Sequence, residues 1–256
     1  MVVSLIDGVD RFVLNNNSSY IYVYAQVGQP YAYLRGLGVA RNAQGHMLID
    51  DGGGLLTKDN DMPFGTASPK WLGGISNTFT FRNFTLNCLI DIKKGGVIYS
   101  GTYSRMLTNG VTAETLYGRD DFYKHSIIFG ENSSELSGGA IWDAYFANGQ
   151  KNTQYISPQS YEYARPNYAE FVMFDASYVK VRELSVGYNY PVKLLSRTPL
   201  KTARFSLVGR NLAIFHKNTP QGIDPEAAST SGNGQGIENG SMPPNTTYGF
   251  NINLTF

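Results

Sequence analysis

Strict alternation of apolar and polar residues marks the last segment of the chain, residues 246–256. One face of this segment carries Tyr248, Phe250, Ile252, Leu254 and Phe256. The residues between them are Thr, Gly and Asn, and a period of two predicts a β-strand with one apolar and one polar face. Its aromatic residues and its length of eleven residues are typical of a tilted strand that crosses a bilayer. The pattern therefore predicts a transmembrane β-strand.

The same period predicts four further strands upstream. The first two form the clearest pair, because only Arg82 and Asn83 separate them, as in a tight β-hairpin. Pro191 ends the third pattern, and the fourth alternates less regularly. We expect the five strands to cover residues 71–81, 84–92, 177–190, 201–215 and 246–256.

Short and long connections alternate between these strands, as they do in outer-membrane barrels, where the outer loops are long. The long connections are residues 93–172 and 216–245. Residues 1–70 are expected to be an extracellular loop region with short strands. Residues 71–256 are expected to be the C-terminal strands of a large antiparallel transmembrane β-barrel. Five strands cannot close a barrel, so the predicted fold is all-β and an incomplete barrel, which indicates a fragment.

Composition agrees with this prediction. Charged residues make up only 16% of the chain, aromatic residues 13%, and there are 28 Gly. Such a chain favours strands and turns over helices. The formal net charge of +1 gives no electrostatic signature for nucleic acid, so no nucleic-acid partner is expected. Cys88 is the only cysteine and is expected to be a small apolar residue on a strand face.

Motifs for catalysis are absent from the sequence, so the chain is not expected to be an enzyme, and no catalytic residue or cofactor is assigned. Asp50, Asp51, Asp59 and Asp61 lie close together near three consecutive glycines. Their spacing does not fit an EF-hand loop, and a solvated hairpin tip is the preferred interpretation. No metal site is therefore predicted.

The long connection 93–172 is the expected functional surface, because loops of this length usually bind or cover something. Aromatic faces beside amides and carboxylates suit sugar rings. The alternative, which we rank higher, is that these aromatic residues pack inside the loop or contact a lid protein. The candidate contact residues for a ligand or lid are Trp142, Asp143, Tyr145, Phe146, Tyr161, Tyr163 and Tyr168.

Six collinear segments resemble one known family. They are VGQPYAYLRGL at 27–37, SPKWLGGISNTFTFRNFTL at 68–86, ASYVKVRELSVGYNYP at 176–191, ARFSLVGRNLAIF at 203–215, GIDPE at 222–226 and TYGFNINLTF at 247–256. In the same order, they are similar to the C-terminal part of SusC/RagA-type TonB-linked outer-membrane transporters of Bacteroidetes. The resemblance covers nearly the whole chain.

This resemblance implies a barrel of about 22 strands around an N-terminal plug. Such a barrel lies in the outer membrane, in contact with its lipid. It imports oligosaccharides or peptides, pairs with a SusD-like lipoprotein lid, and reaches the TonB system through an N-terminal part. The resemblance also implies that the assembly machinery recognises the last strand, including Tyr248, Phe250 and Phe256. A different class of protein remains as the alternative: a stand-alone surface or soluble β-rich carbohydrate-binding module.

Overall fold

Two compact units make up the computed structural model of the chain. The structure describes residues 1–6, 8–18, 21–129, 138–196, 198–227 and 232–256. The first unit contains residues 1–68, 97–174 and 228–241, and the second contains residues 69–96, 175–227 and 242–256. In the described part of the chain, no helix is both long enough and apolar enough to cross a membrane.

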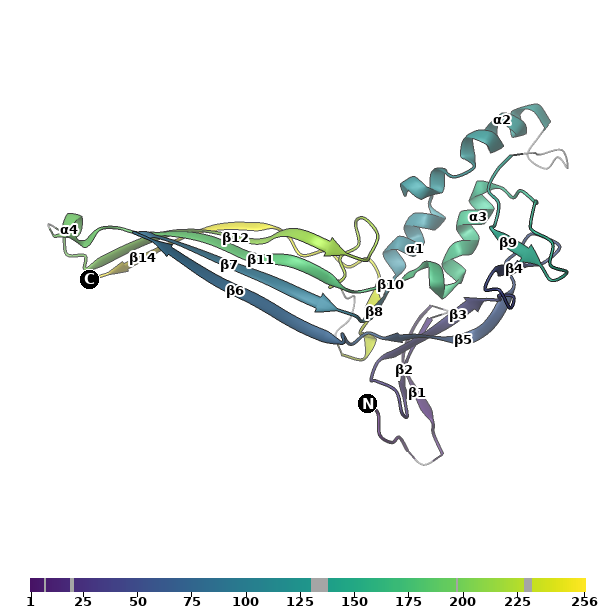
Figure 1. The fold of residues 1–256 in the computed structure, drawn as a ribbon, viewed down its shortest axis with the longest axis horizontal. Coiled ribbons are helices and arrows are strands. Elements are labelled where there is room, and N and C mark those ends of the chain that lie inside the picture. Colours follow the sequence, from purple (N-terminus) through teal and green to yellow (C-terminus); the bar gives the residue numbers. More distant parts are fainter. Residues whose placement is uncertain (7, 19–20, 130–137, 197, 228–231) are drawn as a thin grey trace. The chain divides into compact units, whose positions relative to one another are not determined.

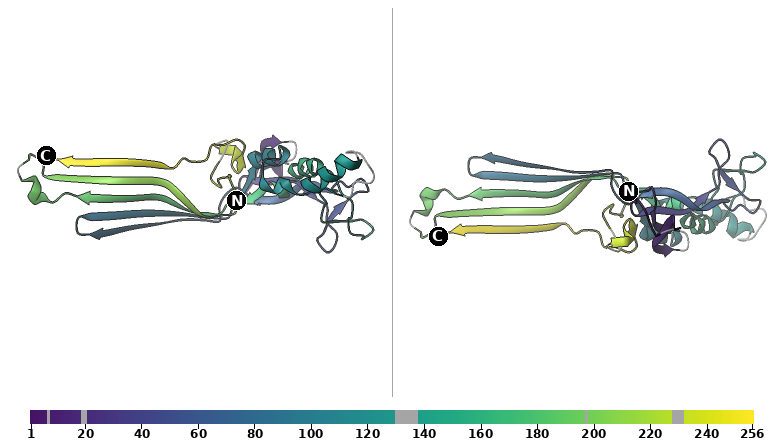
Figure 2. Two further views of the ribbon diagram at one scale, coloured as in Figure 1. Left: turned by 90° about the horizontal axis from the view of Figure 1, so that it is seen from above. Right: turned by 90° about the horizontal axis from the view of Figure 1, so that it is seen from below.

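The second unit is one antiparallel sheet of five strands in the order β14-β12-β11-β7-β6 (Figure 1). The strands are β6 (Trp71–Phe81), β7 (Phe84–Lys94), β11 (Tyr178–Asn189), β12 (Thr202–Lys217) and β14 (Thr247–Thr255), and the short helix α4 (Val192–Leu195) lies between β11 and β12. Figure 2 shows the strands side by side in a single layer. These are the five predicted strands. Arg82, in the turn between β6 and β7, has a left-handed φ of 52°, which fits the predicted tight hairpin.

The register carries each predicted face across all five strands. One row consists of Phe79, Leu86, Val186, Leu207 and Phe250. The next row, on the opposite face, consists of Thr80, Thr85, Gly187, Ser206 and Asn251. Residues paired across neighbouring strands share a face, so the alternation within each strand becomes one apolar and one polar face of the whole sheet.

β-Bulges explain the irregular alternation in β11 and β12. The register of β11 shifts directly after Val181 against both of its neighbours, and Asn211 on β12 has a left-handed φ of 51°. A bulge adds one residue and so reverses the phase of the alternation. Lys180 before the bulge and Ser185 after it therefore lie on the same polar face, although their positions in the chain differ by five, an odd number.

The first unit contains the remaining strands in three small sheets. The antiparallel sheet β1-β2-β3-β5 consists of β1 (Arg11–Ser18), β2 (Ile21–Gln26), β3 (Tyr33–Val39) and β5 (Thr57–Thr66). The sheet β10-β8-β13 consists of β10 (Met173–Asp175), β8 (Val97–Ser100) and β13 (Ile237–Glu238). Finally, β4 (Met47–Ile49) pairs in parallel with β9 (Ala144–Phe146). This last pair joins the region before β6 to the long connection after β7.

Local sequence signals define the helices of the first unit. They are α1 (Gly101–Thr108), α2 (Arg119–Phe129) and α3 (Pro158–Ala164), with the 3-10 turns η1 (Ala113–Leu116), η2 (Arg165–Asn167), η3 (Ala169–Phe171) and η4 (Gly232–Gly234). Ser100 caps α1 by accepting from the Tyr103 amide, and Ser157 caps α3 in the same way, with Pro158 in its first turn. Both caps satisfy backbone N–H groups that would otherwise lack partners.

Candidate functional site

The apolar face of the five-stranded sheet is exposed in this chain. Phe79 is 60% exposed, Leu207 67% and Phe250 65%, although all three lie within strands. Soluble sheets cover such a face with another layer, and a large exposed apolar surface marks contact with a membrane or a partner. This apolar face is therefore typical of a sheet surface that contacts a membrane.

Small hydroxyl and amide side chains occupy the opposite face. The Thr78 hydroxyl donates to Asn87 Oδ1 at 2.8 Å, and Asn87 Nδ2 donates to Ser185 Oγ at 3.0 Å. This row of hydrogen bonds joins three strands. Side chains of this kind offer further donors and acceptors to water or to a polar solute. The polar face is therefore suited to line an aqueous passage.

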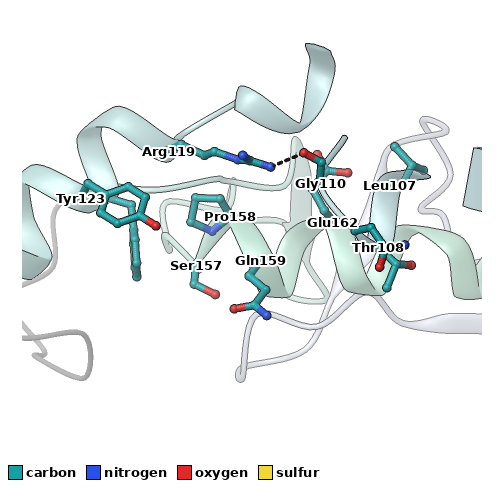
Figure 3. Close-up of a pocket in the computed structure, with 11 residues that line it drawn as sticks. Leu107, Thr108, Gly110, Arg119, Tyr123, Ser157, Pro158, Gln159 and Glu162 are labelled. Atoms are coloured by element: carbon teal, nitrogen blue, oxygen red, sulfur yellow. Dashed lines mark hydrogen bonds between the residues drawn. The ribbon is translucent and has the colours of Figure 1, made fainter. Parts of the chain in front are cut away.

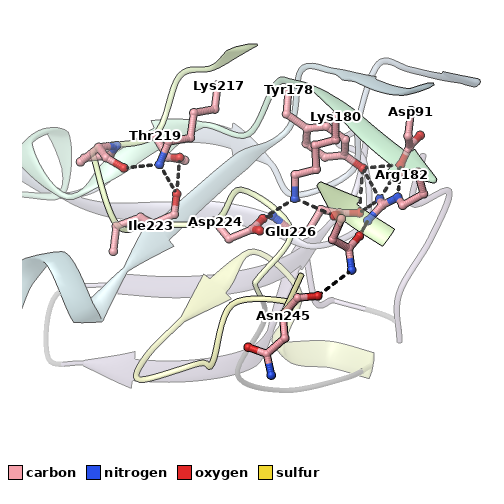
Figure 4. Close-up of polar contacts among 12 residues, drawn as sticks. Asp91, Tyr178, Lys180, Arg182, Lys217, Thr219, Ile223, Asp224, Glu226 and Asn245 are labelled. Carbon is pink, nitrogen blue, oxygen red and sulfur yellow. Dashed lines mark hydrogen bonds and ion pairs between the residues drawn. The ribbon is translucent and has the colours of Figure 1, made fainter. Parts of the chain in front are cut away.

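An ion-pair network lies at one end of this polar face, where β7 and β11 meet the segment that follows β12 (Figure 4). Lys180 Nζ donates to Asp224 Oδ1 at 2.6 Å and to Glu226 Oε2 at 2.7 Å. Arg182 pairs with both Asp91 and Glu226. The side chains of Lys180 and Asp224 are only 5% and 8% exposed. Because an unpaired buried charge is costly, the network fixes this segment to the sheet.

Backbone carbonyls complete the attachment of the segment. Lys217 Nζ donates to the carbonyls of Pro220 at 2.7 Å and Ile223 at 2.8 Å, and the Thr219 hydroxyl donates to the same Ile223 carbonyl at 2.7 Å. The strand β12 thus ends in a compact turn that presents the GIDPE segment, 222–226, to the polar face (Figure 4).

Sequence reasoning did not find this network. It identified GIDPE only as part of the family resemblance and assigned no role to its acidic residues. The available signal was the spacing of Tyr178, Lys180 and Arg182, which places three polar side chains on one face of a strand. The Tyr178 hydroxyl also donates to Glu226 Oε1 at 2.8 Å. Their acidic partners lie more than 40 residues away, which hid the pairing.

The network predicts a specific acid sensitivity. Burial alone would raise the pKa of Glu226, but hydrogen bonds from Arg182, Lys180 and Tyr178 outweigh it and lower the pKa to about 2. A lowered pKa contributes stability that is present above the usual value of 4.5 and is lost as pH falls towards 2. We expect the unfolding free energy to fall across this window. In a Glu226→Gln variant, titrated by denaturant at each pH, this part of the fall should disappear.

The candidate aromatic residues of the long connection belong largely to the core of the first unit. Trp142 is 2% exposed and stacks on Tyr161 with ring centroids 3.9 Å apart. Tyr168 is 8% exposed and donates its hydroxyl to the Leu55 carbonyl. The core cluster comprises Leu37, Val39, Ile49, Leu55, Trp142, Ala144 and Tyr168, with Met47, Phe146, Ile156, Tyr161, Ala164 and Phe171 packed against it. In this arrangement, Trp142 and Tyr168 pack inside the unit.

The other candidates lie nearer to solvent. Tyr163 is 63% exposed, and the Asp143 side chain is 84% exposed and pairs with Lys151 at 3.2 Å. Tyr145 stacks on His46, with ring centroids 4.5 Å apart. The seven candidates therefore do not form one surface. Asp143 and Tyr163 are the exposed members of the set, and Tyr145, Phe146 and Tyr161 are half-buried.

A cavity of about 430 Å³ lies between α1, α2 and α3 of the first unit (Figure 3). Arg119 Nη2 donates to the Gly110 carbonyl at 3.0 Å. Glu162 is 4% exposed and pairs with Arg165 at 2.9 Å; burial raises the pKa of Glu162, although Arg165 opposes this. The cavity is lined by Leu107, Thr108, Asn109, Gly110, Arg119, Phe122, Tyr123, Ser157, Pro158, Gln159 and Glu162. Sequence reasoning missed this site because three separate segments build its wall.

The terminal strand presents its aromatic residues on the exposed apolar face. Tyr248 is 81% exposed and Phe250 65%, and Phe256, one residue beyond the strand, is 69% exposed. Tyr248 and Phe250 pair across to Gly209 and Leu207 of β12. They therefore point away from the polar face that carries the hydrogen-bonded row.

An antiparallel sheet with one exposed apolar face and one polar face is the fold of part of a membrane β-barrel. Comparison with known proteins shows which barrels the chain is similar to. No family model matches the chain. It is 26% identical over 219 residues to TonB-dependent receptor P3 of Formosa agariphila, and 24% identical over 212 residues to TonB-dependent receptor P26 of the same organism. These matches cover 83% and 81% of the chain.

Solved structures show the same fold. The RagAB peptide transporter matches 99% of this chain with a TM-score of 0.58 and 16% identity, and the RagAB importer in its closed-closed state matches with a TM-score of 0.56. The chain spans 19% of the length of the two curated relatives and 26% of the RagAB chain. The predicted resemblance to SusC/RagA-type TonB-linked transporters is thereby confirmed, as is the predicted fold class. The relatives are named as receptors and transporters, and none is named as an enzyme.

Proposed function

We propose that this chain supplies five wall strands and outer loops to a TonB-dependent importer in the outer membrane. The proposal rests on the two faces of the sheet, because the apolar face is suited to contact lipid and the polar face is suited to line a water-filled passage. The similarity to TonB-dependent receptors supports the same assignment. The outer loops are then residues 1–70 and the long connections 93–172 and 216–245.

The cargo is an oligosaccharide or a peptide, delivered with a SusD-like lipoprotein lid and energised through TonB. The likeness to a peptide importer supports the transport of polar cargo. Asp143 and Tyr163 are the exposed candidates for contact with cargo or lid. The cavity lined by Arg119 and Glu162 offers a second polar surface on the same unit.

Expression of the chain alone tests the proposal against the carbohydrate-binding module. The sheet edges at β6 and β14 and the exposed apolar face should make the isolated chain aggregate or require detergent. Size-exclusion chromatography without detergent is the measurement. A soluble, monodisperse species that binds glycans would instead favour the module.

The terminal strand should matter for assembly more than for binding. Replacing Tyr248 and Phe250 by Ser, or deleting Phe256, should lower the amount of folded barrel in the outer membrane, because these side chains face outward. Uptake per folded molecule should hardly change. Heat-modifiable migration of membrane fractions measures the amount of folded barrel. Normal folded levels combined with lost cargo affinity would place these residues in a binding site.

A further inference from the structure

Arg204 is a charged residue on the polar face of the sheet. It lies on β12 in a row with Asn189 of β11 and Asn253 of β14. The adjacent row on the same face contains Ser206 and Asn251. Arg204 is therefore a cation among neutral hydrogen-bonding side chains.

The guanidinium of Arg204 lies against Gly187, which has no side chain. A Cβ atom on Gly187 would lie 2.8 Å from Nη2 and 2.9 Å from Nε of Arg204, closer than real Cβ contacts. The backbone of Gly187 is an ordinary strand, outside the left-handed region that favours glycine. The absence of a side chain at Gly187 therefore lets the Arg204 side chain approach the backbone closely. The Arg204 side chain lies across the sheet surface instead of extending freely.

Arg210 gives an internal comparison on the same strand and face. Its Nε donates to Glu183 Oε2 at 2.9 Å, so its charge is compensated. Within the described residues, the Arg204 guanidinium has neither a hydrogen bond nor an ion pair. A guanidinium is always charged, and its planar fork matches a carboxylate through two parallel hydrogen bonds. Arg204 is thus held in place with its binding capacity unused.

We propose that Arg204, whose guanidinium lies against Gly187, is a carboxylate-binding site on the luminal wall of the transporter. This inference rests on the proposed function, since it requires the polar face to line the passage. Asn189 and Asn253 lie beside Arg204 in the same row of the sheet, and Ser206 lies in the next row on the same face, so these side chains can donate further hydrogen bonds to the same anion. The carboxylate belongs either to acidic cargo or to another segment of the same transporter.

The test uses the whole transporter, purified in detergent, and two oligopeptide probes that differ only in Glu against Gln. Arg204→Gln removes the charge, Arg204→Lys keeps the charge without the fork, and Gly187→Ala keeps the charge but displaces the guanidinium. Arg210→Gln is the matched control. Equilibrium binding of each probe and the thermal unfolding midpoint without probe are measured for every variant.

If the carboxylate is that of the cargo, the unmodified protein should bind the Glu probe at least about tenfold more tightly, and Arg204→Gln should abolish this preference. Gly187→Ala should lose part of it, and Arg210→Gln none. If the carboxylate is the transporter's own, Arg204→Gln should lower the unfolding midpoint more than Arg210→Gln, with partial rescue by Arg204→Lys. The inference would be overturned if the unmodified protein bound the Glu and Gln probes equally and if Arg204→Gln and Arg210→Gln had equal unfolding midpoints. The importer assignment would then still stand. Failure of the unmodified protein to insert into the outer membrane would instead overturn the proposed function and this inference with it.

Discussion

Replacing Leu86 with Arg should destabilise the membrane-inserted sheet by about 2–4 kcal/mol. Leu86 lies inside β7, between Phe79 of β6 and Val186 of β11, in an entirely apolar row. A guanidinium at this position would replace a hydrocarbon contact and would have to be desolvated in lipid. Ile252→Arg on β14 should behave in the same way, because its partner across the strands is Phe205.

The matched control is Asn251→Arg, one residue away on the polar face. It should cost much less, since its side chain enters the aqueous side. Denaturant titration of the whole transporter in lipid vesicles, followed by tryptophan fluorescence, measures the unfolding free energy of all three variants. Equal costs at Ile252 and Asn251 would argue against a lipid-facing register. Spin labels that report water at Leu86 and lipid at Asn87 would show that the register is wrong by one residue.

Replacing Lys180 with Met should cost about 3–5 kcal/mol, the largest effect expected outside the apolar face. Lys180 pairs with Asp224 and with Glu226, and the Asp224 side chain is only 8% exposed. Removing the ammonium group would leave Asp224 buried without its cation. The segment that carries GIDPE should then detach from the sheet and become accessible to protease.

Arg210→Met provides the control, because the Arg210 and Glu183 side chains are 65% and 35% exposed. Such an exposed pair contributes only about 0–1 kcal/mol. Unfolding free energies of the two variants, together with limited proteolysis, test the difference. A double variant, Lys180→Met with Asp224→Asn, should recover part of the loss. Similar small costs for Lys180→Met and Arg210→Met would show that the buried network does not hold the segment.

Alternation within a strand is a local property, and it predicted the sheet well. The pairs at β6 and β7 and the terminal β14 agree with the sequence to within two residues at their ends. These elements could be predicted because the side chains that specify them are close together in the chain.

The aromatic residues of the long connection show what alternation cannot decide. A Trp beside an Asp is compatible with sugar binding and with core packing alike. Only packing between distant segments buries Trp142, whose ring lies against Tyr161 in the core cluster of the first unit. Similarly, the bulge after Val181 keeps Tyr178, Lys180 and Arg182 on the polar face, where distant acidic residues reach them. No local pattern contains that information.

The five strands of the sheet, their two faces and the family resemblance could be predicted from the amino-acid sequence, because strand period and turn chemistry depend on neighbouring residues. The partners of the buried charges depend on the folded arrangement, as in the pairing of Lys180 with Asp224, 44 residues further along the chain. The same holds for the burial of the aromatic residues and for the room that Gly187 leaves for Arg204. Those outcomes depend on packing between segments that are distant in the chain, and a burial pattern of that kind exists only once the chain has folded.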